Sequence, residues 1–147
     1  MTDTDAVADA DLRDRWTAME KRYGESGVQR TFGLSMSVVG RGEVLVHFDG
    51  RPEGANRSGN TAGGVLTQMI DSAVVQAAAT CISDGDGLTT LELKVNFVRA
   101  APPGGPLTAR ATIKHEGRTT AVGAGEIVDA EGRTVALGLV TVALRRR

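Results

Sequence analysis

The sequence is poor in the residues that build disulfides, metal sites and aromatic cores. It has one cysteine, Cys81, which excludes an internal disulfide and a zinc site made of several cysteines. It has five aromatic residues against 19 glycines, so we expect a core of small and aliphatic side chains with closely packed backbone elements. We expect no metal site, because His47 and His115 fall on different predicted strands and share no ligand spacing with Asp or Glu.

The sequence also lacks an excess of charge of one sign and a long apolar run. Lys and Arg number 17, Asp and Glu number 18, and the net charge is −1. This balance gives no electrostatic reason to expect nucleic acid or an anionic membrane as a partner. No apolar stretch approaches the roughly 20 residues that span a bilayer. The N-terminal segment is acidic and lacks the basic and apolar regions of a signal peptide, so we expect a cytoplasmic protein.

The pattern of apolar residues predicts one α+β domain over residues 1–147. Helical spacing predicts a helix near residues 9–23 and a second, apolar over most of its circumference, from Gly63 to about Ser83. Alternating runs bounded by turns predict strands over residues 34–40, 43–49, 91–97, 107–114, 118–129 and 133–144. An apolar helix between two groups of strands is best buried by one curved antiparallel sheet that wraps around it.

The residues of most chemical interest lie in the loop over residues 50–62 and at the start of the second helix. Gly63 and Gly64 lie where a helix exposes unpaired N–H groups and the positive end of its dipole, which suits an anion or an oxyanion. Two turns later, Asp71 places a carboxylate on an otherwise apolar helix, where it suits a general base or a nucleophile. The residues alone leave an alternative open, in which the glycines only permit tight packing and Asp71 is an ordinary helix residue.

The segment reads Asn-x-x-Gly-x-x-Ala-Gly-Gly, from Asn56 to Gly64, and then seven residues that end in Asp71. With this spacing it resembles the hotdog-fold acyl-CoA thioesterases of the phenylacetyl-CoA thioesterase type, whose motif ends in a catalytic Asp or Glu. Their motif has a His where this chain has Ala62. The similarity covers roughly residues 30–144. It implies a hotdog fold, a curved antiparallel sheet around one long central helix, to which this chain adds an N-terminal helix.

The resemblance implies a role for each matched residue. Asp71 would activate water as a general base or attack the thioester carbonyl as a nucleophile. The Gly63 N–H would hold the developing oxyanion, and Asn56 would hydrogen-bond near the same oxygen or fix the loop. Thr90, on the strand after the helix, would hold the attacking water. Thr89 is the alternative, because alternation along a strand sends only one of the two into the site.

The resemblance also implies how substrate binds and how chains assemble. Ala62 and Gly64 would flank Gly63 beside the thioester. Arg118, which follows a glycine as in the family, is the first candidate for the phosphates of coenzyme A. No cofactor is expected. A homodimer is implied, or a tetramer of two dimers. Gly63 and Asp71 lie about 12 Å apart along a helix, so we expect Gly63 of one chain to meet Asp71 of the other.

Three functions from different classes remain after this interpretation. The first is hydrolysis of an acyl-CoA or related thioester to a free acid and a thiol. The second is a non-catalytic hotdog protein that binds acyl-CoA or a small ligand and lost turnover with the His. The third, a hydratase or dehydratase, is disfavoured because such enzymes generally use a His with the carboxylate. Fold alone does not decide between them.

Overall fold

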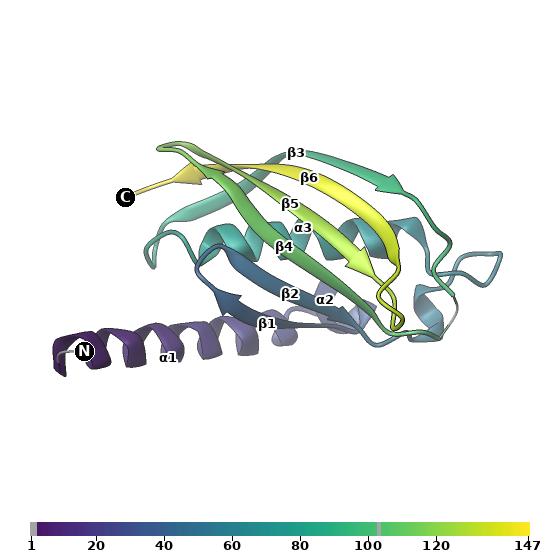
Figure 1. Cartoon of the computed structure of the whole chain (residues 1–147), viewed down its shortest axis with the longest axis horizontal. Coiled ribbons are helices and arrows are strands. Elements are labelled where there is room, and N and C mark those ends of the chain that lie inside the picture. The colour runs from purple at the N-terminus through teal and green to yellow at the C-terminus, as the bar shows by residue number, and fades with distance from the viewer. Residues whose placement is uncertain (1–2, 103) are drawn as a thin grey trace.

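The computed structural model describes residues 3–102 and 104–147. Its elements, in chain order, are α1 (Asp3–Glu25), α2 (Gly27–Phe32), β1 (Leu34–Gly40), β2 (Glu43–Phe48), the 3-10 turn η1 (Pro52–Gly54), α3 (Gly63–Ala79), β3 (Gly87–Phe97), β4 (Leu107–Glu116), β5 (Thr120–Val128) and β6 (Thr134–Arg145). The strands form one sheet in the order β1-β2-β4-β5-β6-β3. Neighbouring strands are antiparallel, and the sheet curves around α3 (Figure 1). The predicted α+β architecture is confirmed.

The helices differ from the predictions in length and number. α1 begins before and ends after the predicted range 9–23. α2 and η1 were not predicted, because with six and three residues they are too short to show a hydrophobic period. Within residues 3–102 and 104–147, no helix combines the length and the apolar character needed to cross a membrane.

α3 ends at Ala79, before the predicted end near Ser83, because polar side chains bind its last carbonyl groups. The hydroxyl of Thr80 donates to the carbonyl of Ala77 at 2.6 Å. The guanidinium of Arg15, on α1, donates to the carbonyl of Ala79 at 3.2 Å. The carbonyl groups at the end of a helix have no donors within the helix. Here the adjacent residue Thr80 and the distant residue Arg15 supply the donors. Hydrophobic periodicity carries no signal of that contact.

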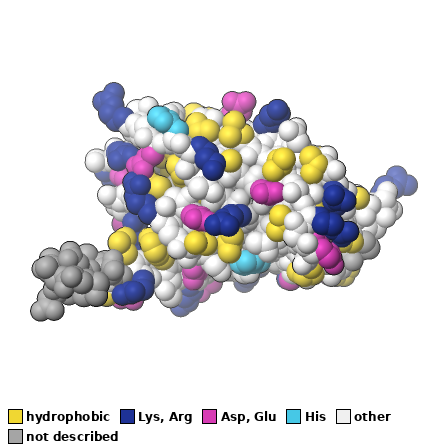
Figure 2. All heavy atoms as spheres, in the orientation of Figure 1, with side chains coloured by type: hydrophobic (Ala, Val, Ile, Leu, Met, Phe, Trp, Pro, Cys, Tyr) yellow, Lys and Arg dark blue, Asp and Glu magenta, His cyan; other side chains and the backbone are white. Residues whose placement is uncertain are grey.

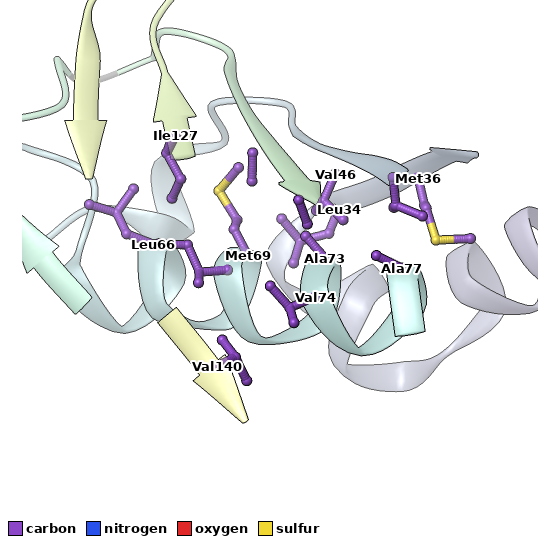
Figure 3. Close-up of a cluster of buried hydrophobic side chains, with 14 of the residues drawn as sticks. Leu34, Met36, Val46, Leu66, Met69, Ala73, Val74, Ala77, Ile127 and Val140 are labelled. Carbon is purple, nitrogen blue, oxygen red and sulfur yellow. The ribbon is translucent and has the colours of Figure 1, made fainter. Parts of the chain in front are cut away.

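The core fills the space between α3 and the inner face of the sheet. In Figure 3, the side chains of Leu66, Met69 and Val74 on α3 lie beside Ile127 of β5 and Val140 of β6. Each fully buried aliphatic side chain contributes about 1.5–3 kcal/mol to folding. The expectation of an aliphatic core is confirmed, because aliphatic and small side chains make up most of the buried set.

Glycines on β5 and β6 let α3 lie close against the sheet. A Cβ atom at Gly123 would lie 2.5 Å from Cγ1 of Val74, and one at Gly138 would lie 2.6 Å from Cγ2 of Ile70. Both distances are far below van der Waals contact, so a larger residue would push the helix away. The high glycine content predicted that backbone elements pack closely. Gly123 and Gly138 are positions where the helix and the sheet do so.

The two edges of the sheet are β1 and β3. β3 is 11 residues long, and its Leu91 and Phe97 are 60% and 54% exposed. On the outer face of the sheet, Leu137 and Leu139 of β6 are also exposed. On the face seen in Figure 2, apolar side chains lie between charged ones. Long exposed edges and apolar patches of this kind favour association with another chain.

We expect Gly138→Ala to destabilise the protein, because the new methyl group would overlap with Ile70 and lie 3.1 Å from the carbonyl oxygen of Lys94. Overpacking of this kind lowers the free energy of unfolding by about 1–3 kcal/mol, which a urea titration measures. Gly24→Ala is the control: among the described residues outside its own helical turn, no atom lies within 4 Å of the added Cβ. Equal stability of the two variants would contradict the close packing of α3.

Candidate active site

The carboxylate of Asp71 on α3 accepts a hydrogen bond from the hydroxyl of Thr90 on β3, with 2.8 Å between Oγ1 and Oδ1. Both residues are half-buried. Thr90 points to the inner face of the sheet, because its cross-strand partner Val142 is buried in the core. Its neighbour Thr89 is exposed, as alternation along a strand requires. Of the two threonines that the sequence analysis left open, the structure therefore brings Thr90 to Asp71.

α3 begins at Gly63 without a side-chain cap. The preceding residue is Ala62, whose methyl group cannot accept a hydrogen bond and whose backbone is extended. In the described part of the chain, no oxygen accepts a hydrogen bond from the N–H of Gly63 or of Gly64. These two donors lie at the positive end of the helix dipole. They are available to an anionic oxygen.

A cavity of about 390 Å³ opens beside the start of α3, and its wall includes Gly63, Leu66 and Phe97. The ring of Phe97 lies over Gly63, because a Cβ atom there would be 3.2 Å from Cζ of Phe97. The free N–H group of Gly63 thus borders a partly apolar hollow, where a hydrogen bond is stronger than in bulk water.

The side chain of Asn56 holds the loop that precedes α3. Its Oδ1 accepts hydrogen bonds from the backbone N–H of Ser58 at 2.9 Å and of Asn60 at 3.2 Å. Its backbone N–H donates to the carbonyl of Asn60 at 2.7 Å. Two roles were left open for Asn56, and this geometry supports the one in which it fixes the loop.

Gly63, Asp71 and Arg118 are separated within one chain. Gly63 and Asp71 lie on the same helix, about 12 Å apart along its axis. Arg118 is exposed in the turn between β4 and β5, and its neighbour Thr119 accepts a hydrogen bond from Leu144 near the end of β6. This turn lies toward the C-terminal end of α3, away from Gly63 (Figure 1). In the described part of the chain, no cluster of three His, Cys, Asp or Glu could hold a metal ion.

A buried pair of polar side chains, Tyr23 on α1 and Ser72 on α3, was not predicted from the sequence; Ser72 directly follows Asp71 in the chain. The hydroxyl of Tyr23 on α1 is 2.8 Å from Oγ of Ser72, and both residues are buried. Burial raises the pKa of Tyr23 to about 12, so the phenol stays neutral in the physiological range. Tyr23 is the last residue of the predicted helix 9–23. A buried tyrosine hydroxyl needs a partner, and a serine on an apolar helix was the available signal.

Solved structures share this architecture. A thioesterase from Haemophilus influenzae superposes with a TM-score of 0.82 at 19% identity and covers 89% of this chain and 90% of its own. The chain therefore has the hotdog fold, as predicted. Residues 58–136 match the family model of the thioesterase superfamily, and the chain belongs to that superfamily.

Two further relatives are similar over most of their length. The acyl-coenzyme A thioesterase PaaI of Escherichia coli strain K12 is 27% identical over 122 residues, which make up 83% of this chain and 85% of the relative. The 1,4-dihydroxy-2-naphthoyl-CoA hydrolase of Listeria monocytogenes is 26% identical over 121 residues, which make up 82% of this chain and 98% of the relative. Both names describe enzymes that act on thioesters of coenzyme A.

We expect Asn56→Ala to loosen the loop, because the N–H groups of Ser58 and Asn60 lose their acceptor. Each lost hydrogen bond costs on the order of 1 kcal/mol, so amide hydrogen exchange at these two residues should become faster in an NMR measurement. Asn56→Asp is the matched control, because it keeps an acceptor oxygen and should retain the protection. Unchanged exchange in Asn56→Ala would rule out the loop-fixing role.

Proposed function

We propose that the protein hydrolyses an acyl-CoA or related thioester to a free acid and a thiol. Membership of the thioesterase superfamily supports this, as do two similar enzymes named for CoA thioesters. The hydrogen bond between Asp71 and Thr90 carries the proposal, because it orients a carboxylate on a half-exposed side of an otherwise apolar helix. A carboxylate held in this way is suited to attack on a carbonyl or to activation of water.

In the proposed reaction, Thr90 donates to Oδ1 of Asp71, and Oδ2 remains for the chemistry. In one route Oδ2 takes a proton from the attacking water and gives it to the thiolate that leaves when the carbon–sulfur bond breaks. In the other route Oδ2 attacks the thioester carbonyl and expels the thiolate, and water then hydrolyses the mixed anhydride. The N–H of Gly63, with Gly64 beside it, stabilises the negative charge that develops on the carbonyl oxygen. Ala62 brings no side-chain donor to that oxygen, so the backbone carries this role alone.

Each proposed site combines two chains of a homodimer. The oxyanion donor and the carboxylate must lie within a few Å of one carbonyl, whereas Gly63 and Asp71 of one chain are about 12 Å apart. Two α3 helices related by a two-fold axis bring Gly63 of one protomer to the partner's Asp71. The unpaired edge of β3 and the less buried face of α3, which includes Gln68 and Val75, supply the surface. Arg118 would then lie toward the partner's Gly63.

We also propose how dimers could assemble further and where the protein is located. Leu137 and Leu139 are 43% and 51% exposed on the outer face of the sheet, which supplies a surface on which two dimers could pair. A cytoplasmic location and the lack of a cofactor stay predictions from the sequence.

The alternative is a hotdog protein that binds acyl-CoA or a small ligand without turnover. Ala62 favours it, because this residue stands at the N-cap of α3 where the family motif has a His. Binding of acyl-CoA without release of thiol, across a panel of acyl groups, would establish the alternative.

We expect Asp71→Asn to fold normally and to lose most hydrolysis. The amide keeps the shape of the carboxylate and can still accept from Thr90, but it is neither a base nor a nucleophile. Loss of general-base catalysis lowers kcat by about 10²–10⁴-fold, measured as thiol release from acyl-CoA. Thr90→Val should lower kcat as well, while Thr89→Val, on the exposed side of the same strand, should not. Turnover near that of the wild type in a folded Asp71→Asn protein would remove Asp71 from the mechanism.

Subunit mixing tests the shared site. Gly63→Pro deletes the backbone donor, and the extended backbone of Ala62 suits a residue that precedes proline. Gly63→Ala is the control, because it adds the same Cβ beside Phe97 and keeps the N–H. When Asp71→Asn and Gly63→Pro chains re-pair in equal amounts, half the dimers are mixed and each holds one intact site. We expect about a quarter of wild-type activity. Mixed dimers of folded chains with no recovered activity would refute the arrangement.

A further inference from the structure

The ring of Phe97 packs directly against the first residue of α3. A Cβ atom at Gly63 would lie 3.2 Å from Cζ of this ring, 3.5 Å from Cε2 and 3.6 Å from Cε1, and these are its nearest neighbours outside the adjoining chain and its own helical turn. Gly63 does not have a positive φ, so its backbone conformation is open to other residues. The space that the ring occupies is therefore a structural reason for a glycine at this position.

Two backbone contacts fix the ring beside α3. The pairing of β3 with β6 sets Phe97 opposite Ala136, which is buried in the core, so the ring points to the inner face of the sheet. Beyond the end of β3, the carbonyl of Ala101 accepts a hydrogen bond from the N–H of Thr61 at 3.2 Å. Thr61 lies two residues before Gly63. The strand that carries the ring and the loop that leads into α3 are thus held together.

The ring borders the proposed oxyanion donor and an open hollow at once. Phe97 is 54% exposed, and it forms part of the wall of the cavity of about 390 Å³ together with Gly63, Leu66 and Ala101. Among the described residues, no Asp or Glu lines this cavity. The N–H of Gly63 has no acceptor in the described part of the chain. The ring is therefore placed to control what reaches this donor.

Two properties of the ring favour negative charge on an oxygen that binds to Gly63. First, an apolar ring excludes water, which would otherwise compete for the N–H, and a hydrogen bond is electrostatically stronger where water is excluded. Second, Cζ, Cε1 and Cε2 belong to the edge of the ring, which carries a partial positive charge. Both effects grow as the carbonyl oxygen of a thioester becomes an oxyanion.

We propose that Phe97 is a positioning residue of the active site, whose ring shields the N–H of Gly63 from water and thereby strengthens its hydrogen bond to the oxyanion. This inference rests on the proposed function. Phe97 acts on Gly63 of its own chain. In a site shared between two chains, it therefore serves the carboxylate of the partner's Asp71.

The first test compares kcat with KM. Thiol release is measured with acetyl-CoA, hexanoyl-CoA and benzoyl-CoA, and the variants are compared on the thioester that the wild type hydrolyses fastest. We expect Phe97→Ala to lower kcat about tenfold, as the loss of one net hydrogen bond predicts. KM should stay nearly unchanged, because the shielding acts on the developing charge and not on the neutral thioester. Phe97→Leu keeps an apolar cover and should retain most of kcat.

Leu91→Ala is the matched control for an effect on folding or assembly. Leu91 is 60% exposed on the same edge strand and does not line the cavity, so this variant should keep the kcat of the wild type. Light scattering and a urea titration compare the mass and stability of all variants. A loss of kcat that Leu91→Ala shares, or that follows a loss of the dimer, would assign the ring to assembly and overturn the inference.

The second test does not depend on turnover. An N–H without an acceptor is protected from hydrogen exchange only where water is kept away from it. Amide exchange measured by NMR on the full-length protein should therefore become about tenfold faster at Gly63 in Phe97→Ala and stay slow in Phe97→Leu. Gly64 is the internal reference, because no atom lies within 4 Å of a Cβ added there. Equal exchange at Gly63 in the wild type and in Phe97→Ala would refute the shielding.

Subunit mixing shows which half of the shared site the ring serves. Phe97→Ala mixed with Asp71→Asn should recover about a quarter of wild-type activity, because each mixed dimer holds one intact site. Phe97→Ala mixed with Gly63→Pro should recover nothing above the residual activity of Phe97→Ala, because every site then carries one defect. Recovery with Gly63→Pro would overturn the inference.

Failure of the inference is distinct from failure of the proposed function. Thiol release by the wild type together with an unchanged kcat in Phe97→Ala refutes the inference alone. No thiol release by the wild type refutes hydrolysis. Faster exchange at Gly63 in Phe97→Ala would then leave the shielded donor as part of a binding site, and unchanged exchange would refute both.

Discussion

The close contact between α3 and the sheet is the constraint on which the rest of the structure depends. It exists because β5 and β6 carry glycines where α3 crosses them, and Cβ atoms at Gly123 and Gly138 would overlap with Val74 and Ile70. Because one side of α3 packs closely against the sheet, the helix cannot rotate about its own axis. Asp71 is therefore presented to β3, where the hydroxyl of Thr90 meets it. A shift of the helix would separate these two groups.

α3 divides the molecule into regions with different chemistry. Its apolar side makes the core, its N-terminus presents free N–H groups beside Phe97, and its C-terminal half borders a cavity of about 510 Å³ beside α1. A helix is a rigid spacer of 1.5 Å per residue, so these regions keep fixed separations. In the proposed active site, Gly63 and Asp71 stand two turns apart on one helix, and the two-fold symmetry of a dimer would bring them to the same carbonyl.

Local patterns were enough to predict α3, the long strands and the place of Asp71 on α3, because hydrophobic period and alternation follow from the burial of one face. The predicted strand 91–97 began too late, since β3 begins at Gly87 and includes Thr90. Alternation could not choose between Thr89 and Thr90 until the register with β6 was known. The docking of α1 could not be predicted for a related reason. It depends on contacts of Arg15 with Asp84 and of Tyr23 with Ser72, which join residues far apart in the chain and leave no periodic pattern in the sequence.

The contacts of Arg15 have a consequence for the order in which the fold is completed. This side chain comes from the first helix, yet it binds the last carbonyl of α3, and its ion-pair partner Asp84 follows 69 residues later. Contacts across so long a loop form late, because closing the loop costs entropy before the contact repays it. A chain that emerges from the ribosome holds Arg15 long before Ala79 exists. The C-terminal end of α3 therefore lacks the hydrogen bond from Arg15 until residues 79 to 84 have been made.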